Sequence, residues 1–245
     1  MSVCIVILWY IVQYDTKSAF TECLVRNCMG RVVFFDLDKT LIDCHSSNNW
    51  IWRELKYGNI TYWEALRGLW WLLKYKLGFA QMEDSIRQAI QSFRGQKEID
   101  VQNRISDFWE EDIQARLRPK AKEIIKNHLE AGDVLALITG SSFYLAKIFG
   151  EKWGFTHIVA NRFLVDGETF TGEAQEPLCY GEGKVFYAEK IAKEHGVDLN
   201  DCIFYTDSIS DLPLLEKVGS PVAVHPDFHL KKIAQKRGWE IALWS

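Results

Sequence analysis

Short apolar runs of strand length recur along the chain and alternate with segments of helical character. Five of them predict strands buried within a sheet: VVFF at residues 32–35, VLALI at 134–138, HIVA at 157–160, CIFYT at 202–206 and PVAV at 221–224. FLVDGETFTG predicts a hairpin that turns at Asp166-Gly167. Strands that alternate with helices in this way predict an α/β fold with a doubly wound parallel sheet, similar to a Rossmann arrangement.

Helices are predicted between these strands. Proline is favoured in the first turn of a helix and glycine just after its end, so a helix should run from Pro119 to just before Gly132. Further helices are expected at about 143–153, from GEGK to about His195, from about residue 211 and from about residue 227.

Residues 46–116 have a different character, because helical periodicity dominates and strand signals are few. Apolar side chains recur there at steps of three and four, as at Trp63, Leu66 and Trp70. We expect this stretch to form a separate helical cap. Residues 31–45 and 117–245 would then form the core domain into which this cap is inserted.

The first 30 residues are predicted to be an extension of the core. VCIVILWYIV at residues 3–12 has ten apolar residues, which is too short to span a membrane by roughly half. It also lacks the basic region and cleavage site of a secretory signal. An extra strand, a loose extension and translated sequence upstream of a start at Met29 are the alternatives. We favour the last, because Gly30 and Arg31 lead directly into a strand.

Composition narrows the classes of function. The chain has 245 residues, of which 48% are hydrophobic, and this is enough for one substantial core. Its formal net charge is −4, and it has no basic tract of the kind that nucleic-acid-binding proteins carry. The six cysteines are scattered and form no CxxC pair. A reduced, cytoplasmic chain without a zinc site is therefore expected.

Polar clusters follow three of the predicted strands. DLDKT follows VVFF, TGSS follows VLALI and DSISD follows CIFYT. Ligands bind beyond the carboxyl ends of the strands in open α/β sheets, so these clusters should converge on one crevice. Asp36, Asp38, Asp207 and Asp211 would repel one another there unless a cation neutralised them, and Mg²⁺ prefers such oxygen ligands. The alternative is that each aspartate caps a loop or a helix.

The other two polar features suit an anion. TGSS offers a hydroxyl and backbone N–H groups at the start of a helix, which is also what a simple helix cap provides. Lys184 in GEGK lies at a helix N-terminus, where a cation is unfavourable against the helix dipole; alone, it would more often be a solvated lysine. Together with the carboxylates, these groups are the ones that an enzyme catalysing phosphoryl transfer needs, because the reaction depends on positioning and on positive charge around the phosphoryl group. Asp36 would attack phosphorus, and Asp38 would act as general acid and then as general base.

The motifs DLDKT, ITGSS, GEGK and TDSISD, in this order, resemble the four signature motifs of the haloacid dehalogenase superfamily. With the strand pattern, the resemblance covers about residues 31–245, and a helical cap between the first two motifs is similar to the phosphoserine-phosphatase-like branch, subfamily IB. The resemblance implies a role for each matching residue: Asp36 as nucleophile, Asp38 as acid/base with its carbonyl on Mg²⁺, Thr139 and Gly140 on phosphate, Lys184 steadying both phosphate and nucleophile, Asp207 on Mg²⁺, and Asp211 supporting them.

Two departures bear on the substrate. Phosphoserine phosphatases have a glutamate nine residues after the nucleophile, and this chain has His45; Ser210 stands where that subgroup commonly has asparagine. Phosphoserine is therefore disfavoured, and the chain is also similar to relatives assigned to histidinol phosphate or phosphatidylglycerophosphate. His45 and Ser46 lie just beyond the catalytic strand, either as substrate contacts or as a polar hinge into the cap.

Aromatic residues crowd the predicted cap: Trp50, Trp52, Tyr57, Tyr62, Trp63, Trp70, Trp71 and Tyr75. They would fill the core of a small bundle, or form an apolar pocket or an interfacial face for an amphipathic substrate.

The main hypothesis is a Mg²⁺-dependent phosphomonoesterase that acts on a small or amphipathic organic phosphate. The alternatives are a phosphomutase on the same scaffold, a phospho-acceptor signalling module, and a lipid-binding protein or lipid-phosphate phosphatase at a membrane surface.

Overall fold

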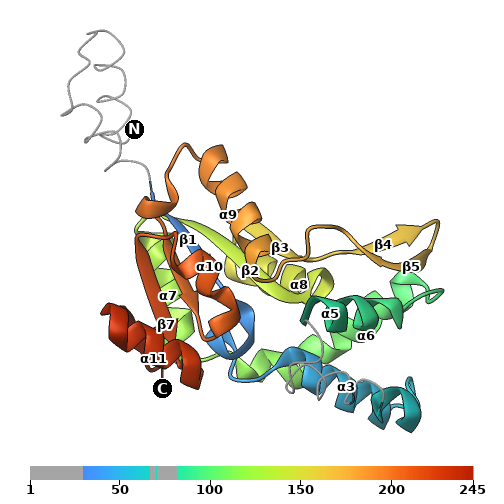
Figure 1. Ribbon diagram of the computed structural model, residues 1–245. Coiled ribbons are helices and arrows are strands. Elements are labelled where there is room, and N and C mark those ends of the chain that lie inside the picture. The colour runs from blue at the N-terminus through green and yellow to red at the C-terminus, as the bar shows by residue number, and fades with distance from the viewer. Residues whose placement is uncertain (1–29, 67–69, 71–81, 245) are drawn as a thin grey trace, which may run out of the picture.

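A six-stranded parallel sheet forms the centre of the fold (Figure 1). The computed structural model describes residues 30–66, 70 and 82–244, so residues 1–29 of the predicted extension and most of the tryptophan-rich stretch at 67–81 lie outside the described residues. The strand order is β3-β2-β1-β6-β7-β8, and every neighbouring pair is parallel. The strands are β1 (Val32–Phe35), β2 (Val134–Ser142), β3 (His157–Asn161), β6 (Ile203–Thr206), β7 (Ser220–Val224) and β8 (Glu240–Ala242).

The predicted doubly wound α/β fold is confirmed, because helices cover both faces of this sheet. Alternate residues of a strand point to opposite faces. Val33 and Phe35 of β1 accordingly pack into one core cluster, and Val32 and Phe34 into the other. The first cluster includes buried residues of α7 (Pro119–Glu130) and α8 (Phe143–Trp153), and the second those of α9 (Glu182–Glu194), α10 (Leu212–Leu215) and α11 (Phe228–Arg237).

The edge strand β8 was not predicted from the sequence. It has three residues, and one of them, Glu240, is exposed. An edge strand pairs on one side only and needs no continuous apolar run, so its sequence carries little strand signal. Pairing with β7, from Val222↔Glu240 to Val224↔Ala242, defines it as a strand.

The segment predicted to be a cap is helical where the structure describes it, with α3 (Ser46–Lys56), α5 (Met82–Gln91) and α6 (Glu98–Phe108). The predicted hairpin, β4 (Phe163–Asp166) and β5 (Thr169–Ala174), belongs to the later part of the chain. It is nevertheless hydrogen-bonded to the turn between α5 and α6, where Phe170 accepts from the N–H of Gly95 at 2.8 Å and donates to the carbonyl of Gln96 at 3.0 Å. The domain boundaries stay a prediction.

No helix in the described part of the chain is both long and apolar enough to cross a membrane. The carboxyl ends of β1, β2 and β6 lie side by side in the sheet, because β1 pairs with both of the others. The three polar clusters of the sequence are therefore placed at one edge.

Replacing Phe149 with alanine is expected to lower the free energy of unfolding by about 3–5 kcal/mol, since it opens a cavity in a packed core. Phe149 is fully buried and contacts the rings of Trp109, Trp153 and Phe155. Urea unfolding followed by circular dichroism measures the loss. Phe228→Ala is the matched control, because that ring is 77% exposed, and it should change stability by less than about 0.5 kcal/mol. Equal effects of the two variants would contradict the packing described here.

Candidate active site

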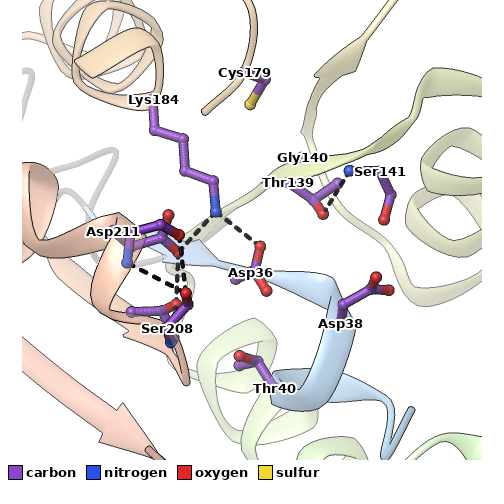
Figure 2. A network of polar contacts seen from close by, with 12 residues as sticks. Asp36, Asp38, Thr40, Thr139, Gly140, Ser141, Cys179, Lys184, Ser208 and Asp211 are labelled. Atoms are coloured by element: carbon purple, nitrogen blue, oxygen red, sulfur yellow. Dashed lines mark hydrogen bonds and ion pairs between the residues drawn. The ribbon is translucent and has the colours of Figure 1, made fainter. Parts of the chain in front are cut away.

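Asp36 and Asp38 lie directly after β1, where the chain turns sharply. The backbone N–H of Asp36 donates to the carbonyl of Tyr205 at 2.9 Å, which extends the pairing of β1 with β6 by one residue. The following turn, Leu37–Leu41, contains Lys39 with φ of 58°, a left-handed conformation that is uncommon for a residue with a side chain. Because of this turn, the side chains of Asp36 and Asp38 point in different directions. Asp36 faces Lys184, and Asp38 points away from it (Figure 2).

Lys184 is buried between two carboxylates from other segments. Its ammonium donates to Asp36 Oδ1 and to Asp211 Oδ2, each at 2.8 Å, and its side chain is 2% exposed. The hydroxyl of Thr206 donates to the same Asp211 oxygen at 2.6 Å. Helix α9, the loop after β6 and the end of β1 are thus joined by one ammonium group (Figure 2).

The site carries more negative than positive charge. Burial raises the pKa of Asp36 to about 6, against the lowering effect of Lys184. Burial and the nearby Asp36 raise the pKa of Asp38 to about 7 and that of Asp207 to about 8. Burial alone would lower the pKa of Lys184, but Asp211 and Asp36 raise it overall, so this lysine stays charged. These directions are those expected when desolvated carboxylates crowd together.

The residues present fit a hard divalent cation. Asp207 follows β6 and lies close enough to Asp36 for the two charges to interact, and Thr40 Oγ1 donates to Asp207 Oδ1 at 3.5 Å. Among the described residues, no three carboxylate, imidazole or thiol side chains come together as a complete metal site. Mg²⁺ is usually held by one or two carboxylates, with water and substrate oxygen in its other positions.

The side chain of Asp38 is engaged with α3. Its Oδ2 accepts from the N–H of Ser46 at 3.0 Å and from the Ser46 hydroxyl at 2.9 Å. The Ser46 hydroxyl lies 3.1 Å from that of Ser141, which belongs to the second motif. The other oxygen, Asp38 Oδ1, is buried and has no hydrogen-bond partner. Ser46 therefore links Asp38 to the predicted anion cradle. His45, just before α3, is exposed.

Thr139, Gly140 and Ser141 lie at the end of β2 on the same side of the site as Asp38 (Figure 2). Thr139 is buried, and its Oγ1 accepts from the N–H of Ser141 at 3.2 Å. The main chain here leaves regular pairing with β3. The predicted anion cradle therefore lies beside the aspartates, and its helix begins at Phe143 with Ser142 as the cap.

Sequence reasoning missed several residues that bond to this edge. Thr40 and Thr206 donate to Asp207 and Asp211, and both stand inside motifs whose aspartates drew attention first. Asn161 at the end of β3 and Asp227 before α11 bond to the motif loops from outside any motif. Nothing in the local sequence marks these two, because their partners are about 20 residues away in the chain.

A comparison with family models identifies residues 33–216 as a match to the haloacid dehalogenase-like hydrolases. The chain belongs to this family. It is 29% identical over 213 residues to the phosphoserine phosphatase SerB1 of Mycobacterium tuberculosis, a match that covers 85% of this chain and 69% of that protein. It is 26% identical over 218 residues to the histidinol-phosphatase of Neisseria meningitidis serogroup C, covering 87% and 98%.

Solved structures show the same fold. A crystal structure of a protein with unknown function from Bordetella pertussis Tohama I superposes with a TM-score of 0.82 at 27% identity, and the match covers 89% of this chain and all of that one. The expected family, the phosphoserine-phosphatase-like branch and the general class of phosphatase are confirmed by these comparisons. The relatives are named for two different substrates, so these comparisons do not fix the substrate of this protein.

Replacing Lys184 with methionine should cost about 3–5 kcal/mol of stability, because a buried pair of carboxylates loses its cation. The partner change Asp211→Asn should also destabilise the fold. The double variant should lose less than the sum of the single losses, since the two groups interact directly. Urea unfolding without divalent metal measures all three.

Lys217→Met is the control for this cycle. Lys217 bonds to Glu189 at 2.8 Å, but both side chains are about half exposed, and such surface pairs contribute at most about 1 kcal/mol. Strict additivity of the Lys184 and Asp211 changes would show that the buried pair is not coupled.

Proposed function

We propose that this protein is a Mg²⁺-dependent phosphomonoesterase that hydrolyses a small organic phosphate through an aspartyl-phosphate on Asp36. The observation that carries the proposal is the convergence of Asp36, Lys184 and Asp211 from three distant segments at 2.8 Å, beside a hydroxyl and backbone N–H groups suited to phosphate. Phosphoryl transfer depends on such positioning and positive charge more than on covalent assistance.

Asp36 is the proposed nucleophile. Lys184 holds its Oδ1, so the rotation of the carboxylate is fixed. A carboxylate oxygen of Asp36 bonds to phosphorus as the bond from phosphorus to the ester oxygen breaks, and water later hydrolyses the acyl phosphate to free phosphate. Lys184 would also attract the anionic substrate, and Asp211 keeps the ammonium in place.

Asp38 is the proposed general acid and base. Ser46 holds Oδ2 with two hydrogen bonds, which leaves the unpaired Oδ1 to give a proton to the departing oxygen. The same oxygen then takes a proton from the attacking water. Thr139 and Gly140 would bind the phosphoryl oxygens through a hydroxyl and a backbone N–H.

Mg²⁺, when bound, supplies positive charge that reduces repulsion between Asp36 and the incoming phosphate. Asp36, Asp207 and the main-chain carbonyl of Asp38 would hold it. Burial first, and then the neighbouring aspartates, raise the pKa values of Asp36 and Asp207. A bound cation would favour the ionised forms of both carboxyl groups.

The substrate class is a small phosphate monoester whose leaving group meets the start of α3. Phosphoserine and histidinol phosphate are the two candidates that relatives' names offer. His45 replaces the glutamate expected for phosphoserine, which favours histidinol phosphate or another substrate without that contact. An amphipathic ester is a second candidate, because Trp52 in α3 and Tyr62 and Trp63, which follow α3 in the chain, are 65%, 80% and 79% exposed.

A screen of phosphate monoesters with Mg²⁺ tests the function directly. It would include phosphoserine, histidinol phosphate, sugar phosphates and a lipid phosphate in vesicles, with free phosphate as the readout. Release of phosphate without a phosphorylated activator separates a phosphatase from a mutase. If no ester in a broad panel is hydrolysed, the proposal is wrong.

Asp36→Asn should abolish turnover, since an amide is a poor nucleophile, and no phosphoenzyme should accumulate after rapid acid quench with labelled substrate. Asp38→Asn should slow turnover by about 100-fold or more, because both proton transfers lose their carrier. This second variant should still bind phosphate. Wild-type rates in the Asp36→Asn protein would exclude that residue as the nucleophile.

Removal of divalent metal should stop hydrolysis, and added Mg²⁺ should restore it. Dialysis against EDTA followed by Mg²⁺ titration measures this, with the thermal midpoint recorded alongside. We also expect Mg²⁺ to raise that midpoint in the wild type, since it binds the folded state, and to raise it less in Asp207→Asn. Full activity after exhaustive chelation would contradict the assigned role of the ion.

A further inference from the structure

Asn161, at the end of β3, joins two segments of the candidate site through its side chain. It is 3% exposed. Its Nδ2 donates to the carbonyl of Gly140 at 2.7 Å, and its Oδ1 accepts from the N–H of Cys179 at 2.9 Å. The amide nitrogen therefore acts as donor and the amide oxygen as acceptor. These two partners fix the orientation of the amide group, with its nitrogen towards Gly140 and its oxygen towards Cys179.

The bond to Gly140 replaces a missing sheet hydrogen bond. Ile138 pairs with Val159, but the next pair is Ser142 with Asn161, so three residues of β2 lie opposite one residue of β3. Such a bulge leaves backbone groups without their ladder partners. Buried carbonyl groups need a partner, and the Asn161 side chain supplies one to Gly140.

This bond also fixes the orientation of the anion cradle. The Gly140 carbonyl and the Ser141 N–H belong to one planar trans peptide, so they point in opposite directions. With the carbonyl held by Asn161, the N–H points at Thr139 Oγ1, 3.2 Å away. Accepting this bond uses a lone pair of the Thr139 hydroxyl and not its proton, so the hydroxyl can still donate to a phosphate oxygen.

The second bond links the cradle to the segment that carries Lys184. Cys179 lies in the loop before α9, and a Cβ added at Gly183 would lie 1.8 Å from the carbonyl of Leu178, so loop and helix are in tight contact. Asn161 thus joins the phosphate-binding end of β2 to the loop that packs on the first turn of α9.

We propose that Asn161 is a positioning residue that sets the geometry of the phosphate cradle. The inference rests on the proposed phosphatase function and deepens it. Asn161 does not touch the reacting atoms; it acts through the Gly140–Ser141 peptide on Thr139, and through Cys179 on the loop before α9.

The variant Asn161→Asp tests this by exchanging a single heavy atom, the amide nitrogen, for oxygen. The ionised side chain of this variant would bring an acceptor oxygen against the Gly140 carbonyl oxygen, and the two would repel. The neutral acid would instead donate its O–H to that carbonyl and restore the bond. At pH 8 we expect kcat/KM to fall about 100-fold relative to wild type, as for a small misplacement of a binding group. Inhibition by inorganic phosphate should weaken in parallel. The ratio of variant to wild-type activity should rise as the pH falls towards 5.

Asn161→Ala should show the same loss without recovery at low pH, and it keeps the test decisive if the aspartate variant fails to fold. Asn200→Asp is the matched control, because the Asn200 amide bonds to Asp198 on the exposed surface. Val218→Ala controls for a general loss of core packing. Both controls should keep the wild-type pH profile and phosphate inhibition.

The outcomes separate the two proposals. A wild-type protein that hydrolyses no ester refutes the function. An active wild type with unchanged phosphate inhibition and an unchanged pH profile in both Asn161 variants refutes the positioning role alone. A loss in Asn161→Asp that does not depend on pH would reduce Asn161 to a packing role and would also overturn the inference.

Discussion

The crowding of carboxylates around one buried ammonium group is the interaction on which the rest of this site depends. Asp36, Asp38, Asp207 and Asp211 lie at one edge of the sheet, and Lys184 bonds to two of them. Buried like charges are costly, and the raised pKa values of three of these acids reflect that cost. In the mechanism that we propose, a cation would reduce the repulsion between these carboxylates and a phosphate dianion. Charge balance would then couple metal binding to substrate binding.

Sheet topology is what allows these groups to meet. Because β1 lies between β2 and β6, the residues that follow all three strands reach the same edge. Both faces of the sheet are covered by helices, so the strands are held rigidly by two cores. A rigid edge suits a reaction that depends on positioning, since the carboxylate, the hydroxyl and the ammonium group must keep fixed separations. The packing of the two cores therefore also maintains the geometry of the site.

Bonds from outside the motifs complete this arrangement. Asn161 holds the bulge in β2, and Asp227 accepts the N–H of Ile209 at 2.7 Å while its own N–H donates to the carbonyl of Asp207 at 2.8 Å. Ser46 connects Asp38 to the start of α3. Through that last bond, any movement of α3 would act directly on the proposed acid and base. Helix α3 is in this way connected to the proposed acid and base.

The sequence by itself determined the fold class, the family and the main acidic residues. Continuous apolar runs identify buried strands, and polar clusters after three such runs must converge if the sheet is parallel. Asp36 and Asp207 follow from that logic, whereas the role expected for Lys184 came from the resemblance to the family's motifs. The tertiary structure alone decided that Asp38 turns towards Ser46, that the hairpin bonds to the turn between α5 and α6, and that Asn161 bonds to Gly140. These depend on bulges, edge pairing and side-chain bonds between segments distant in sequence. A pattern along the chain does not encode them, because they arise only when the packed core brings the partners together.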